Sequence, residues 1–296
     1  MHFKYLIYIL IIFVILNFLN KKIKKYSQIY KNNGFDGVWF YFYNKNIKKT
    51  GLSNFVDKKK NFLGKKIERL SKSKILYGPY AGTKILNSFG WSSTDFAAKF
   101  LGTYESQIQK KIILLSKKFK LKNFVDLGAA EGYHIVSLLN KNYFSKGIAY
   151  EINKKSRDLL KKNSITNKVI KKISIFSGAS FDSLSKNLHN INQNQTLFLV
   201  DIEGNEFNLF NDKFCNFFSK SFFIIEDHKF NVRNKKTINK FYKTIRKKFK
   251  VEIIKDIPKN PFEYKILDKF TDDEKYLMMS EGRPETMQWI VLYPKN

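Results

Sequence analysis

The chain has 296 residues, of which 55 are Lys or Arg and 25 are Asp or Glu, giving a formal net charge of +30. With 43% hydrophobic residues and Cys215 as its single cysteine, it is neither a disordered, a collagen-like nor a disulfide-stabilised chain. Fifty of the basic residues are Lys and only five are Arg, a mixture typical of AT-rich codon usage. The charge is therefore weak evidence for nucleic acid, which we do not expect as a partner.

An apolar run at the start of the sequence contains no charged residue from Tyr5 to Leu19. It predicts a transmembrane anchor over residues 1–20, with a shallow interfacial anchor as an alternative. A cleaved signal peptide is a further alternative, but no small-residue cleavage pattern follows the run. Four lysines lie between residues 21 and 25, so the positive-inside rule predicts a single-pass protein whose body faces the cytoplasm.

Residues 21–94 read as a basic juxtamembrane and lead-in region. Between residues 20 and 75 there are 16 basic and three acidic side chains. Ser93 or Thr94 can cap a helix that we expect from Asp95 to Lys118. We therefore begin the main domain at residue 95 and extend it to residue 296.

From residue 124 onward, short β-branched or aromatic runs alternate with helical stretches, the pattern of a parallel sheet with crossover helices. This predicts an α/β, Rossmann-like, doubly wound domain with seven strands. The expected strands are Phe124–Leu127, Gly147–Glu151, Ile173–Phe176, Leu197–Ile202, Phe222–Glu226, Val251–Ile254 and Gln288–Leu292.

The first expected strand runs into a glycine-containing turn and then a helix, where nucleotide-like ligands bind in such sheets. Gly128 and Gly132 allow the backbone to turn sharply and to approach a ligand. Glu151 lies at the end of the second expected strand, 19 residues after Gly132. A carboxylate at that place can hold both ribose hydroxyls.

With Asp126 inside the first motif, these residues resemble the first motifs of class I S-adenosylmethionine-dependent methyltransferases. The sequence departs from the common pattern in one place, because Ala130 occupies the position of the middle glycine. Asp182 is expected near the adenine amine, with a helix N-cap as the alternative. The resemblance implies S-adenosylmethionine as cofactor, held by Asp126, Gly128, Ala130, Glu131, Gly132, Glu151, Asp182 and Asp201.

Two further segments resemble FkbM-like methyltransferases. Asp201–Glu206 has the pattern Asp-x-Glu-Gly-x-Glu, and Glu226–His228 has the pattern Glu-x-His. The similarity covers residues 126–228, with fainter similarity at Gly102–Glu105 and Glu281–Trp289. It implies O-methylation of a hydroxyl on a small molecule, a sugar or a lipid-linked acceptor.

Methyl transfer to a hydroxyl needs an in-line geometry and a base for the proton. His228 is the candidate base because its ordinary pKa lies near neutrality, and Glu226 or Asp227 can orient its ring. The catalytic set is completed by carboxylates at the end of the fourth strand: Asp201, Glu203 and Glu206. A structural alternative is that Asp201 and Glu206 accept backbone N–H groups of the turn around Gly204.

A divalent cation is a second possible device for activating the hydroxyl. Asp201, Glu226 and Asp227 offer the oxygen ligands that Mg²⁺ prefers. Tyr104 and Glu105, on the expected helix before the first strand, are candidates to close over the cofactor. Arg283 can clamp a carboxylate or phosphate, or pair with Glu281 or Glu285.

Two other classes of function are open. A nucleic-acid methyltransferase suits the charge, but the sequence lacks an Asn- or Asp-Pro-Pro-Tyr motif, and Cys215 does not follow a proline. A catalytically inactive, membrane-anchored scaffold with a methyltransferase fold suits the anchor and Ala130. The scaffold predicts no cofactor binding.

Overall fold

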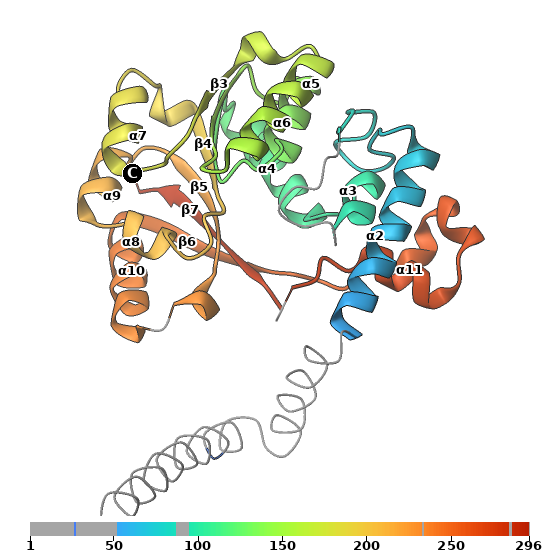
Figure 1. The fold of residues 1–296 in the computed structure, drawn as a ribbon. Helices are drawn as coiled ribbons and strands as arrows, with labels where there is room; N and C mark the ends of the chain where they lie inside the picture. Colours follow the sequence, from blue (N-terminus) through green and yellow to red (C-terminus); the bar gives the residue numbers. More distant parts are fainter. Residues whose placement is uncertain (1–26, 28–51, 87–94, 233, 284–285, 296) are drawn as a thin grey trace, which may run out of the picture. The chain divides into compact units, whose positions relative to one another are not determined.

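A computed structural model describes residues 27, 52–86, 95–232, 234–283 and 286–295 (Figure 1). Helix α2 spans Leu52–Ser71, and a compact unit comprises Lys60–Asn296. The predicted membrane anchor at residues 1–20 lies outside the described residues, as do Ser93 and Thr94. Within the described ranges, no helix has the length and apolar character to cross a bilayer.

Seven strands form one sheet in the order β3-β2-β1-β4-β5-β7-β6. Strands β1 to β5 pair in parallel, whereas β7 is antiparallel to both of its neighbours, β5 and β6. The order thus contains one complete mononucleotide-binding half, and antiparallel β7 interrupts the second. The strands are β1 (Asn123–Leu127), β2 (Lys146–Tyr150), β3 (Ile173–Phe176), β4 (Thr196–Val200), β5 (Phe222–Glu226), β6 (Phe249–Lys255) and β7 (Gln288–Pro294).

Helices cover both faces of this sheet (Figure 1). One face packs against α4 (Ser106–Phe119), α5 (Tyr133–Asn140) and α6 (Lys154–Thr166). The other packs against α7 (Phe181–Asn187), α8 (Glu206–Leu209), α9 (Asp212–Phe217) and α10 (Lys235–Lys248). Strand residues alternate between the two cores: Phe124 belongs to the first and Val125 to the second. Both faces are therefore buried, as the continuous apolar runs of the central strands require.

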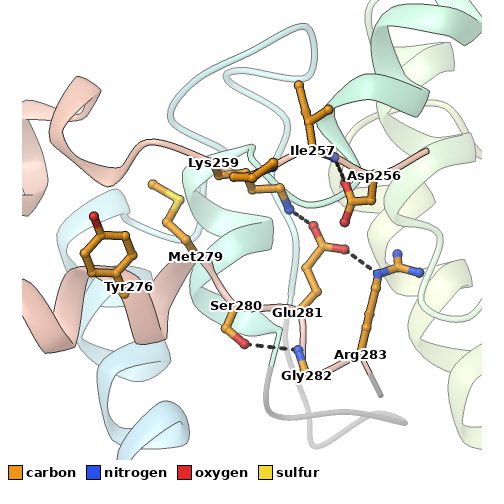
Figure 2. A pocket seen from close by; sticks show the side chains of 10 residues that line it. Asp256, Ile257, Lys259, Tyr276, Met279, Ser280, Glu281, Gly282 and Arg283 are labelled. Carbon is orange, nitrogen blue, oxygen red and sulfur yellow. Dashed lines mark hydrogen bonds and ion pairs between the residues drawn. The ribbon is translucent and has the colours of Figure 1, made fainter. Parts of the chain in front are cut away.

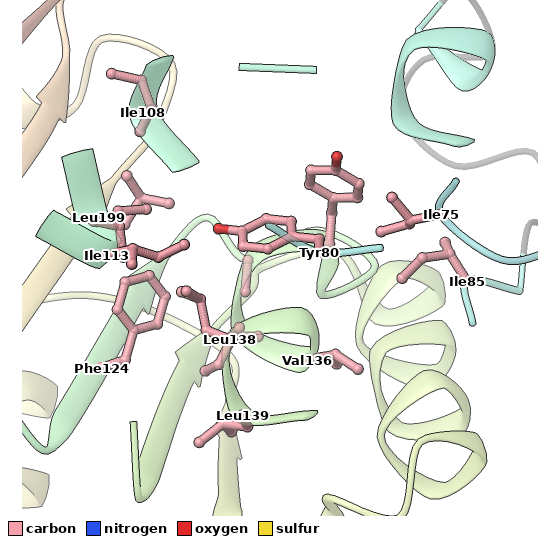
Figure 3. Close-up of a cluster of buried hydrophobic side chains, with 14 of the residues drawn as sticks. Ile75, Tyr80, Ile85, Ile108, Ile113, Phe124, Val136, Leu138, Leu139 and Leu199 are labelled. Atoms are coloured by element: carbon pink, nitrogen blue, oxygen red, sulfur yellow. The ribbon is translucent and has the colours of Figure 1, made fainter. Parts of the chain in front are cut away.

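The lead-in residues from 60 to 86 are part of the same core. Ile75, Tyr80 and Ile85 pack in the cluster that contains Phe124 of β1 and Leu138 of α5 (Figure 3). The boundary that we expected at residue 95 therefore differs from the structure, where the compact unit begins at Lys60. Helix α11 (Asp272–Met279) adds its buried methionines to this cluster.

The prediction of seven strands is confirmed, and two of them, β3 and β5, have the expected bounds. The prediction of one helix from Asp95 to Lys118 is wrong, because the chain forms α3 (Phe96–Leu101) and then α4. Gly102 ends α3 with φ +80°, and Glu105 precedes α4 with φ +47°. Both values are left-handed, so helix geometry cannot continue through this turn.

Candidate functional site

The glycine turn after β1 brings two strand ends together. Gly128 has φ +90°, and a Cβ atom there would lie 1.7 Å from the backbone oxygen of Asp201, just after β4. Gly132 has φ +87° and is the N-cap of α5. Ala130 takes φ +44°, so a non-glycine residue occupies the left-handed region at the position of the expected glycine.

Glu151 is fixed at the end of β2 by two backbone groups. Its carboxylate accepts hydrogen bonds from Ala130 N at 2.9 Å and Asn153 N at 2.6 Å. Its residue exposure is 5%, whereas the next side chain, Ile152, is 80% exposed. A rigid carboxylate beside an exposed apolar side chain thus flanks the glycine turn.

A small cavity of about 40 Å³ lies between this turn and the α3–α4 turn. That volume holds about three water molecules. Its lining contains one lysine, Lys99, against four carboxylates: Glu105, Asp126, Glu131 and Asp201. Tyr104, from the α3–α4 turn, also lines it, as do Gly128 and Ala130.

The single lysine is already committed to acidic partners. Lys99 Nζ lies 2.6 Å from Glu131 Oε1 and 3.1 Å from Asp95 Oδ2. Burial opposes its charge, but the two carboxylates outweigh burial and raise the pKa of Lys99. Glu131, expected to bind cofactor, therefore holds Lys99. Among the described residues, neither Asp126 nor Asp201 forms an ion pair with Lys or Arg.

These two carboxylates are difficult to ionise where they lie. Burial raises the pKa of Asp126 to about 7; the charge of His134 opposes this rise, and the charges of Glu105 and Glu151 add to it. Burial and the neighbouring Glu226 likewise raise the pKa of Asp201 well above its usual range. Asp201 Oδ1 is a buried atom with no hydrogen-bond partner.

Glu105 is held from two sides. Its Oε1 lies 2.7 Å from Arg283 Nη2 and its Oε2 lies 3.0 Å from His134 Nε2, while Tyr80 Oη lies 3.0 Å from His134 Nδ1. Burial raises the pKa of Glu105, but the hydrogen bond with His134 and the charge of Arg283 prevail and lower it to about 2. Glu105 is therefore a permanent anion in the cavity wall.

Arg283 joins three segments that are distant in the sequence. It pairs with Glu105, with Glu226 at the end of β5, and with Glu281 through its Nε at 2.9 Å. The expected pair with Glu281 is present, whereas Glu285 lies outside the described residues. Because guanidinium presents several N–H groups in one plane, one Arg can bridge these carboxylates at once.

His228 follows β5 and is 96% buried at its side chain. Its Nδ1 lies 3.2 Å from Glu206 Oε1, and its backbone N–H donates to the same oxygen at 3.2 Å. Glu206 Oε2 accepts from Gly204 N at 2.9 Å, as the structural interpretation of this carboxylate predicts. Glu206, not Glu226 or Asp227, orients the imidazole through Nδ1.

The other ring nitrogen of His228 faces three carboxylates. Nε2 lies 3.5 Å from Asp201 Oδ1, 3.6 Å from Glu226 Oε2 and 3.7 Å from Glu203 Oε2. Burial lowers the pKa of His228, but the hydrogen bond with Glu206 and the charge of Glu226 outweigh it, and the pKa is raised. The ring can thus hold a proton at the edge of the site.

The expected metal set is not assembled. Asp227 is 1% exposed, and its Oδ2 accepts hydrogen bonds from Tyr242 Oη at 2.5 Å and from Gln288 Nε2. The side chains that do meet are Asp201, Glu203 and His228, whose ligand atoms lie within 4.8 Å of one another. That set mixes nitrogen with oxygen, unlike the all-oxygen set that we expected for Mg²⁺.

Asp182 also differs from expectation. Ser180, not Asp182, caps α7, because its Oγ accepts from Ser183 N at 3.2 Å. The Asp182 side chain is 90% exposed and lies 3.7 Å from Lys213 Nζ. The helix-cap interpretation is therefore wrong, and a contact with adenine stays a prediction.

Sequence reasoning missed three residues of the site. Lys99 carries no signal in a chain with 50 lysines, and Tyr80 lies in a segment that we assigned to the lead-in region. His134 is placed by the glycine-turn motif, lines the cavity and contacts Glu105 through its Nε2. Only the folded chain points to Lys99, because the buried carboxylates of Asp95 and Glu131 need a cation as partner.

No protein-family model matches the sequence, and no curated protein matches it either. Among solved structures, an O-methyltransferase from Bacillus cereus in complex with SAH is 12% identical, with 63% of this chain and 80% of that chain covered and a TM-score of 0.44. The O-methyltransferase TomG from Streptomyces achromogenes in complex with SAM is 9% identical, with coverages of 71% and 92% and a TM-score of 0.46. The tRNA methyltransferase TrmK from Bacillus subtilis is 10% identical, with coverages of 64% and 65% and a TM-score of 0.39.

Proposed function

We propose that this protein is an S-adenosylmethionine-dependent methyltransferase that methylates a hydroxyl on a small molecule, a sugar or a lipid-linked acceptor. One observation carries the proposal. In a chain of net charge +30, the cavity beside the glycine turn is lined by four carboxylates and one lysine. Lys99 compensates Glu131 and Arg283 compensates Glu105. Asp126 and Asp201 have no Lys or Arg partner among the described residues, so a cationic ligand would favour the ionised form of both.

The sulfonium of S-adenosylmethionine is such a cation. Dinucleotides and nucleoside triphosphates carry phosphates, which the carboxylates would repel. The glycine turn is otherwise suited to either kind of ligand, so the charge of the cavity distinguishes between them. Asp126 and Asp201, which have no Lys or Arg partner among the described residues, gain an opposite charge when a sulfonium binds.

The residues present fit the cofactor in their chemistry. Glu151 offers a carboxylate for the ribose hydroxyls, and exposed Ile152 offers an apolar surface for the adenine ring. Asp201 Oδ1, buried without a hydrogen bond, is available to the cationic part. The enclosed cavity is too small for the nucleoside, which supports a place for it outside, over Glu151 and Ile152.

When bound, S-adenosylmethionine supplies an electrophilic methyl group. The contribution of this chain is to hold the acceptor hydroxyl in line and to take its proton. His228 Nε2 is the acceptor for that proton, because Glu206 fixes the ring through Nδ1. The carboxylates of Glu206, Glu226 and Glu203, which raise the pKa of His228, stabilise the imidazolium that results.

The apolar run at residues 5–19 supports a membrane anchor with this enzyme on the cytoplasmic side. Protease digestion of sealed vesicles that contain the full chain tests this part. Protease added to the cytoplasmic side of these vesicles should cleave the domain without detergent. Protection of the domain until detergent is added would contradict the orientation.

Calorimetric titration tests the cofactor. We expect the parent chain to bind S-adenosylmethionine. The variants Asp126→Asn and Glu151→Gln should each weaken this affinity by about tenfold or more. Asp272→Asn, at a 73% exposed side chain of α11, is the matched control. A folded parent chain that binds neither S-adenosylmethionine nor S-adenosylhomocysteine would support the inactive scaffold instead.

A further inference from the structure

Three possible ligand atoms converge where β4 and β5 end. His228 Nε2 lies 3.5 Å from Asp201 Oδ1 and 3.7 Å from Glu203 Oε2. One ligand atom of each residue lies within 4.8 Å of those of the other two. In a tetrahedral site with bonds of about 2.1 Å, two ligand atoms are about 3.4 Å apart. Both distances from Nε2 are therefore close to those of a metal site.

The imidazole of His228 is oriented in the way that metal-binding histidines are. Its side chain is 4% exposed, and Glu206 Oε1 lies 3.2 Å from Nδ1. A carboxylate at one ring nitrogen keeps the proton there and leaves the lone pair of the other nitrogen for a metal. The oxygens of Asp201 and Glu203 face Nε2 from beyond the limit of about 3.2 Å for ordinary hydrogen bonds. The space between the three atoms suits an ion.

The two carboxylates lack a permanent cation. Among the described residues, neither Asp201 nor Glu203 forms an ion pair with Lys or Arg. Asp201 Oδ1 is also a buried atom without a hydrogen-bond partner. Because a buried carboxylate oxygen without a partner is costly, a cation at this place would stabilise the folded chain.

Arg283 does not supply that charge. Its guanidinium pairs with Glu105, Glu226 and Glu281, and Lys259 contacts Glu281 from the other side (Figure 2). Glu226 Oε2 lies 3.6 Å from the imidazole Nε2, but its other oxygen is bound to Arg283. Glu226 therefore belongs to the arginine cluster, and the two carboxylates that follow β4 remain for a metal.

The ligand types select the metal. One imidazole nitrogen with two carboxylates suits Zn²⁺ and related first-row ions, whereas Mg²⁺ and Ca²⁺ prefer oxygen ligands alone. Two carboxylates also balance the charge of a divalent ion. The side chain of Asp201 is 30% exposed and that of Glu203 is 67% exposed, so an ion can enter from solvent and keep water as a further ligand.

We propose that Asp201, Glu203 and His228 bind a divalent transition metal such as Zn²⁺, and that the bound metal prevents His228 from acting as the base. The site differs in ligands and in metal from the magnesium set that the sequence suggested. Metal binding stands without the proposed function, whereas its inhibitory effect rests on it. Nε2 has one lone pair, so a metal on this atom excludes the proton of the acceptor hydroxyl.

Calorimetric titration of the full chain with Zn²⁺ and with Mg²⁺ tests the selectivity. We expect Zn²⁺ to bind at least about 100-fold more tightly than Mg²⁺, because only Zn²⁺ gains from the imidazole ligand. Equal affinities, or no binding of Zn²⁺, would overturn the proposal.

Matched variants locate the ion. Glu203→Gln and His228→Gln should each weaken Zn²⁺ binding by about tenfold or more. The controls are Glu263→Gln, in the exposed short helix Pro261–Glu263, and His189→Gln, at an exposed histidine, and neither should change the affinity. Glu203 is largely exposed, so its variant should fold whatever happens to buried His228. An unchanged affinity in Glu203→Gln would place the ion elsewhere and overturn the assignment.

Nitrogen NMR of the imidazole rings tests the blocked base. Zn²⁺ should shift the Nε2 resonance of His228 and leave the ring of His189 unaltered. An unshifted Nε2 resonance in the presence of saturating Zn²⁺ would contradict the proposal.

S-Adenosylhomocysteine binding, measured on the same samples, separates this proposal from the proposed function. If Zn²⁺ binds as expected but S-adenosylhomocysteine does not bind to the parent chain, then the proposed function fails and the metal site remains. If S-adenosylhomocysteine binds and Zn²⁺ does not, only the metal site fails.

Discussion

A single carboxylate oxygen of Glu206 contacts both the backbone and the imidazole ring of His228. Oε1 accepts the backbone N–H of His228 at 3.2 Å and lies 3.2 Å from Nδ1 of the imidazole. Glu206 is itself fully buried and is anchored by Gly204 N. The orientation of the candidate base is therefore determined by a residue on α8, across the strand end, and not by its sequence neighbours.

Glu206→Gln should lower the pKa of His228. The hydrogen bond with Glu206 is the main factor that raises this pKa against burial, and a neutral amide stabilises the imidazolium less. Imidazole NMR titration of the parent and the variant measures the change. Exposed His189, whose Nδ1 contacts the backbone oxygen of Lys186, is the internal control. An unaltered His228 titration would show that Glu206 does not control the ring.

The preference for S-adenosylmethionine over S-adenosylhomocysteine, which lacks the sulfonium charge, should increase with pH through about 7. The pKa of Asp126 is raised to about 7, so its neutral form predominates below that pH and its anion, which attracts the sulfonium, above it. Calorimetric titrations of both ligands between pH 5.5 and 8.5 measure the ratio of affinities. Asp126→Asn should flatten this dependence. A flat ratio in the parent chain would show that Asp126 does not contact the cation electrostatically.

Gly128→Ala should destabilise the protein by more than about 2 kcal/mol, because alanine at φ +90° is strained and its Cβ would meet the Asp201 backbone oxygen at 1.7 Å. Gly178→Ala is the matched control, since a Cβ there has no atom within 4 Å. Urea unfolding monitored by circular dichroism gives both free energies of unfolding. Equal stabilities would mean that the β1 and β4 ends are further apart than described.

Arg283→Met should lower the free energy of unfolding by about 3–5 kcal/mol, since it leaves buried carboxylates without their cation. Lys213→Met, which removes an exposed ion pair with Asp182, should change it by less than about 1 kcal/mol. Urea unfolding measures both effects.

The Arg283→Met effect should also depend on pH. Glu105 has a pKa lowered to about 2, so the stability from its charge is present above its unfolded pKa and is lost as the pH falls toward 2. The difference between Arg283→Met and the parent should therefore narrow from pH 5 downward. A difference that stays constant over this range would exclude Glu105 as the group that Arg283 stabilises.

Much of the sheet could be predicted from the sequence because its strands are buried on both faces. The apolar run that begins at Leu197 predicted a strand over Leu197–Ile202, and the structure has the fully buried strand Thr196–Val200 there. The break in the helix before β1 was missed although the sequence marks it, because Gly102 ends α3 in the left-handed conformation that glycine favours. The φ of +47° at Glu105, before α4, leaves no such mark because Glu105 is not a glycine.

The positions of site residues could be predicted where a motif determines the backbone. The partners of charged and polar side chains could not. Gly128, Gly132 and Glu151 lie together as expected. By contrast, Asp227 was expected in the site only because it is next to Glu226, and alternation along the chain turns it toward Tyr242. The partners of Arg283 come from residues 105, 226 and 281, a combination that only the folded chain brings together.

The place of β7 in the sheet has a consequence for synthesis of the chain. Strand β6 has β7 as its only described sheet neighbour, and β7 follows all other strands in the sequence while lying between β5 and β6. As the polypeptide leaves the ribosome, strands β1 to β5 can pair in turn, but β5 keeps an open edge and β6 has nothing to join until Gln288–Pro294 emerges. A nascent chain stalled before this segment would therefore expose the open edge of β5 and the whole of the unpaired β6, and would be a substrate for chaperones.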